Sequence, residues 1–151
     1  MDTCIGENDG APFTFPGVGE IVDKKMEFKD PSPRVPDFVQ VLERPSVRDP
    51  GIVVQLGLRF SDRFEPPNRF QLTRYNNSFL KKWEVPLVDF SDPPPDSSVV
   101  LYWDPKEVGY KEKRELGFTY GLGSVQAEDK LGVTVGGQSF VNGELSIVGL
   151  V

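Results

Sequence analysis

The chain has 151 residues, a formal net charge of −6, no histidine and one cysteine. The missing histidines exclude Ser-His-Asp and Cys-His catalysis and His-ligated metal sites within these residues, and the single Cys4 excludes an internal disulfide and cysteine-only metal sites. The acidic balance disfavours binding to nucleic acid or to an anionic membrane surface, and no apolar run approaches the ~20 residues that span a bilayer.

Short apolar segments in the first third of the chain predict β-strands. Residues 13–15 and 25–28 are two such segments. Residues 38–42 form a third, but their apolar positions also fit a 3.6-residue period, so a short helical turn stays open. Three prolines just before this segment end any helix that would lead into it.

The clearest predicted strand lies within residues 52–61. Five large apolar residues alternate there with smaller or polar ones, and they define the expected core face: Ile52, Val54, Leu56, Leu58 and Phe60. Residues 69–73 alternate in the same way and predict the next strand. Pro66-Pro67 marks the intervening segment as a loop.

Residues 98–103 and 114–120 also alternate between apolar and polar positions. We therefore expect one long hairpin with a charged tip at residues 106–113. The pattern places Tyr120 on a buried face and Tyr102 on an exposed one.

Residues 131–135 and 145–151 have the alternation of two further strands. The polar segment 124–130 is either a turn within one sandwich or a linker to a second domain of which only two strands are present. Seven to nine strands separated by turn signals predict an all-β fold, an antiparallel β-sandwich over residues 1–123. Because the last strand has neither a polar tail nor a returning partner, the pattern predicts a fragment of a longer all-β protein.

Several short motifs follow one another in an order that resembles one family. They are Asp2-Thr3-x-Ile5-Gly6-x-Asn8-Asp9-Gly10-x-Pro12-Phe13, Pro36-Asp37-Phe38 with Leu42-Glu43, Trp83-Glu84-Val85-Pro86, Tyr102-Trp103, and Lys113-Arg114-Glu115 leading to Tyr120-Gly121-Leu122-Gly123. In this order they resemble an uncharacterised all-β domain of large bacterial multidomain proteins that are exported or membrane-anchored. At the hairpin tip this chain departs from the family, because Val108-Gly109-Tyr110 stands where Pro-Gly is usual.

The resemblance implies an extracytoplasmic location, in the periplasm or at the cell surface, and neighbouring domains of the same parent chain as partners. It also implies a β-rich stretch before the Asp2-Thr3 motif and an Ig-like domain that begins at Leu131. Residues 131–151 are then either the start of that domain or the final hairpin of the same sandwich. The family brings no known activity, so no catalytic residue is carried over.

Oxygen-bearing side chains gather near the start of the chain, at Asp2, Glu7, Asn8 and Asp9. Oxygen ligands at close spacing suit Ca²⁺, although the spacing does not match an EF-hand loop. Asn-Asp-Gly is also a turn signal, because these residues tolerate positive φ. We favour the turn and keep calcium, the one candidate cofactor, as the alternative.

Exposed aromatic rings are the second candidate for a site. Tyr75, Trp83 and Tyr102 are the candidate ligand-binding residues, because flat rings on a sheet face stack on sugar rings. Cross-strand pairing of aromatic side chains explains the same pattern without a ligand. If the three rings share one exposed face, carbohydrate binding gains support.

No catalytic motif emerges from the remaining residues. Glutamates such as Glu43, Glu65 and Glu115 could supply a carboxylate pair for glycoside hydrolysis, but nothing in the sequence places two of them together. Cys4 lacks a histidine partner for nucleophilic catalysis. The sequence therefore predicts a non-catalytic structural or interaction module that contacts neighbouring domains and a glycan or protein, with carbohydrate binding as the alternative.

Overall fold

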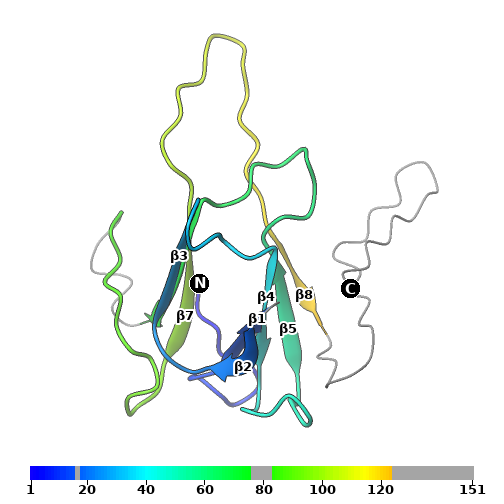
Figure 1. Ribbon diagram of the computed structural model, residues 1–151, viewed down its shortest axis with the longest axis vertical. Coiled ribbons are helices and arrows are strands. Elements are labelled where there is room, and N and C mark those ends of the chain that lie inside the picture. The colour runs from blue at the N-terminus through cyan, green and yellow to red at the C-terminus, as the bar shows by residue number, and fades with distance from the viewer. Residues whose placement is uncertain (16–17, 76–82, 124–151) are drawn as a thin grey trace, which may run out of the picture.

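The structure, a computed structural model, describes residues 1–15, 18–75 and 83–123 (Figure 1). These residues form eight strands and no α-helix. The strands are β1 (Phe13–Phe15), β2 (Val18–Val22), β3 (Met26–Lys29), β4 (Phe38–Leu42), β5 (Val53–Gly57), β6 (Arg69–Arg74), β7 (Ser97–Tyr102) and β8 (Thr119–Leu122). The expected linker 124–130 and the expected strands of 131–151 lie outside the described residues.

The strands make two antiparallel sheets. The larger has the order β2-β1-β4-β5-β8 and the smaller the order β3-β6-β7. One hydrophobic core takes side chains from both, with Phe13 and Leu56 from the larger sheet and Phe70 and Leu72 from the smaller. Figure 1 shows β3 and β7 on one side of the molecule and β4, β5 and β8 on the other, an arrangement consistent with a β-sandwich.

The segment 38–42 is a strand and not the helical turn that its spacing left open. Strand β4 pairs with β5 from Phe38↔Gly57 to Leu42↔Val53, and β1 pairs along its other side. Partners on both sides satisfy the backbone groups of β4, which a single helical turn would not do. The spacing of apolar residues in this segment fits both a strand and a helical turn, and pairing with β1 and β5 favours the strand.

The expected hairpin of residues 98–120 is wrong. Its first arm, β7, pairs with β6 in the smaller sheet, and its second arm pairs through β8 with β5 in the larger sheet. The residues between them, 103–118, form a connection that crosses from one sheet to the other, and Figure 1 shows this β7–β8 connection rising above both sheets. Each arm pairs with a strand that precedes it in the chain, so proximity in sequence did not decide the pairing.

Residues 83–90, called the strap here, run along the outer face of the smaller sheet. The buried hydroxyl of Thr73 on β6 donates to the carbonyl oxygen of Pro86 at 2.7 Å and accepts the backbone N–H of Val88 at 2.9 Å. Phe90 then enters the core, where it is fully buried. The strap thus covers polar side chains that would otherwise face solvent.

Residues 1–3 run along the outer edge of β7. The N–H of Val99 donates to the carbonyl of Met1 at 3.0 Å, and the N–H of Thr3 donates to the carbonyl of Ser97 at 3.1 Å. Asp2 lies opposite Ser98 in an antiparallel bridge. This edge of the smaller sheet is therefore covered by the chain itself.

Candidate functional site

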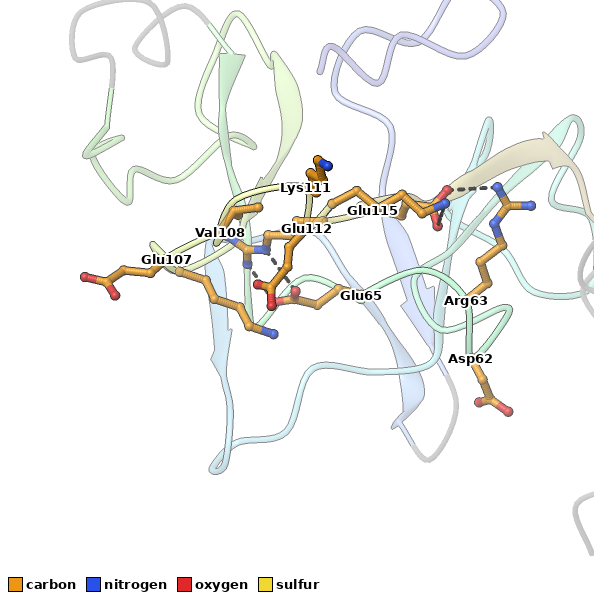
Figure 2. Close-up of a pocket in the computed structure, with 11 residues that line it drawn as sticks. Asp62, Arg63, Glu65, Glu107, Val108, Lys111, Glu112 and Glu115 are labelled. Carbon is orange, nitrogen blue, oxygen red and sulfur yellow. Dashed lines mark hydrogen bonds and ion pairs between the residues drawn. The ribbon is translucent and has the colours of Figure 1, made fainter.

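A charged hollow of about 620 Å³ lies between residues 61–65 and the β7–β8 connection (Figure 2). Five acidic and five basic side chains line it, together with Val108. The backbone N–H of Glu65 donates to the carbonyl of Glu115 at 2.9 Å, and Glu65 bridges Leu116 in parallel. This local pairing brings two distant segments side by side and creates the hollow.

Ion pairs join the two walls of the hollow. Arg114 holds Glu65 in a two-pronged contact, with its Nε 2.9 Å and its terminal nitrogen 2.6 Å from the two carboxylate oxygens. Arg63 donates to Glu115 at 2.8 Å, and Lys113 lies 3.1 Å from the same carboxylate. The planar guanidinium matches a carboxylate in this geometry, so each contact fixes orientation as well as charge.

These contacts keep both carboxylates ionised. The hydrogen bond from Arg114 is the main cause that lowers the pKa of Glu65. The hydrogen bonds from Arg63 and then Lys113 lower the pKa of Glu115 to about 2. A glycosidase needs one carboxylic acid that stays protonated as the general acid, and neither residue meets that requirement near neutral pH.

Three carboxylates meet near the beginning of the chain. The side-chain oxygens of Asp2, Asp9 and Asp96 all lie within 4.8 Å of one another. Asp9 is held there by its own backbone, because its carbonyl accepts the N–H of Ser97 at 2.8 Å. Partial desolvation, and next the contact with Asp9, raise the pKa of the Cys4 thiol, which makes it a poor nucleophile.

Two of the four calcium candidates belong to this cluster and two do not. Asn8 uses its side chain elsewhere, donating to the carbonyl of Glu43 at 2.7 Å and accepting from the N–H of Gly10 at 3.1 Å. Glu7 is exposed beside Gly6, whose φ of +63° makes a tight turn closed by backbone bonds between Ile5 and Asn8. Asn8-Asp9-Gly10 also forms a turn, but none of its three residues has the positive φ that motivated the prediction. Calcium binding stays a prediction.

The three aromatic candidates differ in how much of each ring is presented. Trp83 is 85% exposed at the start of the strap, whereas Tyr75 and Tyr102 are half-buried. The guanidinium of Arg69 lies 4.6 Å from the centre of the Tyr102 ring. The Tyr102 hydroxyl donates to Gln71 at 2.9 Å and accepts the N–H of Val85 at 3.2 Å. One face and the hydroxyl of Tyr102 are therefore already used within the protein.

An exposed apolar row, called the β8 stripe here, escaped the sequence-based reasoning. Its members alternate along the chain and are 43%, 41%, 60% and 87% exposed in order: Leu116, Phe118, Tyr120 and Leu122. The expectation that Tyr120 is buried is wrong, because the smaller sheet does not cover this strand. The alternation was visible in the sequence, but the sequence did not show that the described residues supply no layer opposite this row.

Comparisons with protein-family models, with curated proteins and with solved structures found no match to this chain. Within the part of the chain that the structure describes, we find no helix with the length and hydropathy that a bilayer crossing requires.

Proposed function

We propose that this chain is a non-catalytic structural or interaction module, built as a β-sandwich, of an extracytoplasmic multidomain protein. The contact element in this proposal is the tip of the β7–β8 connection. The observation that carries the proposal is that this long connection is braced at its base while its tip is left open to solvent.

The tip presents apolar and aromatic surface. Tyr110 is 90% exposed and Val108 is 50% exposed. The N–H of Glu112 donates to the carbonyl of Gly109 at 3.0 Å, and the Glu112 carboxylate accepts the N–H of Gly109 at 3.1 Å. These two bonds hold a compact turn, so the Tyr110 ring is displayed on an ordered backbone. Exposed tyrosines of this kind are frequent anchors in protein interfaces.

The base of the connection is fixed by the ion pairs of the charged hollow. Arg114 and Glu115 on the connection bind Glu65 and Arg63 on the facing loop. A braced loop loses less conformational entropy on binding than a free one, which favours affinity. The same pairs leave no protonated carboxylate between Glu65 and Glu115, which supports a role in contact over one in catalysis.

Photo-crosslinking in the native cell tests this proposal. A benzophenone amino acid in place of Tyr110 should give adducts concentrated on one peptide, from a neighbouring domain of the parent chain or from one other protein. The matched control places the same probe at Glu20, an exposed residue on β2, away from the connection in Figure 1. Equal adduct patterns from the two positions would rule out the tip as a contact element.

Carbohydrate binding is the second candidate, and the exposed ring of Trp83 is the observation that favours it. A glycan array read with the native chain and with Trp83→Ala separates the two functions. A glycan signal that depends on Trp83 would replace the interaction-module proposal, and a signal indifferent to the substitution would remove the carbohydrate candidate.

A further inference from the structure

Among the residues that the structure describes, strand β8 has a strand partner on one side only. It pairs with β5 from Thr119↔Gly57 to Leu122↔Val54, and the N–H of Gly123 continues the pairing by donating to Val53 at 2.9 Å. In an antiparallel ladder, hydrogen-bonded residues alternate along the strand. Gly123, Gly121 and Thr119 therefore bond to β5, and the backbone N–H and C=O groups of Tyr120 and Leu122 point away from it.

The side chains of Tyr120 and Leu122 lie on the core-facing side of the sheet. Leu122 is opposite Val54 and Tyr120 is opposite Leu56, and directly opposite residues share a face. Val54 and Leu56 belong to the core, yet their partners on β8 are largely exposed. The larger sheet thus extends its apolar face one strand beyond what the described residues cover.

Two of the other three edges of the described sheets, at β7 and β3, are protected, whereas the described residues leave β8 unprotected. Residues 1–3 cover β7, and β3 carries the charged residues Glu27 and Lys29. Strand β8 reads Thr-Tyr-Gly-Leu and has neither a charge nor a proline to discourage pairing. An edge of this kind is a template for a partner strand with a matching apolar face.

We propose that residues 131–135 of this chain add to the open edge of β8 as an antiparallel sixth strand of the larger sheet. Leu131, Val133 and Val135 alternate with Gly132 and Thr134, which gives one apolar face. Consecutive strands are neighbours in about two-thirds of cases, and the seven residues 124–130 leave ample length for the return. This assignment makes the segment part of the same sandwich and not the start of an Ig-like domain.

Registers that differ by two residues keep the same face, and the proposed register is the following one of them. Leu131 lies opposite Leu122, Val133 opposite Tyr120, and Val135 near Phe118. The apolar side chains of the added strand then extend the β8 stripe, and its backbone bonds to the outward groups of Tyr120 and Leu122. Gly121 and Gly132 become a closely spaced pair without mutual hydrogen bonds on the opposite face.

This glycine pair provides a direct test, because a Cβ at Gly121 meets nothing within 4 Å. The full-length Cys4→Ser chain with Gly121→Cys and Gly132→Cys should form a disulfide within the monomer under mild oxidation, since Cα atoms in such pairs are close enough for one. Peptide mapping without reductant identifies it. The matched control pairs Gly121→Cys with Gly149→Cys and should remain reduced. A disulfide between monomers would assign the edge to a second copy, and a preferred bond to position 149 would assign it to residues 145–151; both results, or no disulfide at all, overturn the proposal.

A non-covalent test uses the two faces of the added strand. Val133→Asp places a charge on the apolar face, and Thr134→Asp places the same charge on the other face. We expect a loss of melting temperature and faster amide exchange at Tyr120 and Leu122 for Val133→Asp only. Equal effects of the two substitutions would show that residues 131–135 do not lie against β8 in this orientation.

Discussion

The outer edges of β7 and β8 differ in what covers them, although one connection joins the two strands. Along β7, residues 1–3 continue the ladder, and Thr3 and Ser97 share a buried hydrogen bond of 2.7 Å between their side chains. Along β8, the described residues supply no further strand, and Leu122 is 87% exposed. A cover only three residues long is thus enough to bury an edge when polar side chains on both strands are matched.

The largest expected loss of stability comes from a substitution in the core on β5, the strand that pairs with β8. Leu56 on β5 is fully buried, and Leu56→Ala should lower the free energy of unfolding by about 2–5 kcal/mol, because it leaves a cavity in the shared core. Urea unfolding measures the change. Leu56→Met is the matched control and should cost less than about 1.5 kcal/mol. Equal losses would show that the core beneath β8 is not closely packed.

The covered edge of β7 offers the next largest effect. Ser97→Ala should lower the free energy of unfolding by about 1–3 kcal/mol, since it leaves the buried hydroxyl of Thr3 without its partner. Thr3→Val should cost less, because the Ser97 hydroxyl keeps its hydrogen bond to the carbonyl of Asp9 at 3.2 Å. The double variant should cost less than the sum of the two, because no hydroxyl is then stranded. Strict additivity in a thermal or urea double-mutant cycle would mean that this hydrogen bond does not secure the edge.

The smallest expected effect is a change of stability with pH that arises from Glu115 on the β7–β8 connection. Arg63 and Lys113 lower the pKa of Glu115 from 4.5 to about 2 in the folded protein. A depressed folded-state pKa contributes stability above pH 4.5, and this contribution is lost as the pH falls towards 2. Carboxyl carbon NMR should show the low pKa, and Arg63→Met should raise it.

Lys106→Met is the matched control for that titration, because Lys106 lines the same hollow without an ion pair to Glu115. It should leave the Glu115 titration where it is. A Glu115 carboxyl that titrates near its ordinary value in the native chain would mean that the bracing of the connection is weak in solution.

Period-two alternation predicted most strands but not their partners. It located β5, β6 and β7 because their apolar residues face one core. It gave the wrong pairing for residues 98–120, since alternation reports which side of a strand is apolar and not which neighbour lies beside it. Strand β2 was missed because Gly19 and Glu20 interrupt its apolar pattern.

The candidate site shows the same division between local and distant information. Asp2 and Asp9 were identified from their spacing, whereas Asp96 joins them only because β7 pairs with the first three residues. The contact of Glu65 with Arg114 also joins positions that are distant in the sequence, and no local motif predicts it. The turn at Asn8-Asp9-Gly10 was accessible from sequence, because these residue types favour turns wherever they occur, whereas the positive φ lies at Gly6.

The late arrival of β8 in the chain has a consequence for folding. Strand β5 can pair with β4 as soon as both have been synthesised, but its other side waits for residues far along the chain. Until then Val53–Gly57 presents an uncharged, apolar open ladder, the kind of segment that associates between molecules. Contacts of such long sequence separation form slowly. Docking of β8 covers this open side of β5. We therefore expect slower docking to leave more chains able to associate with one another.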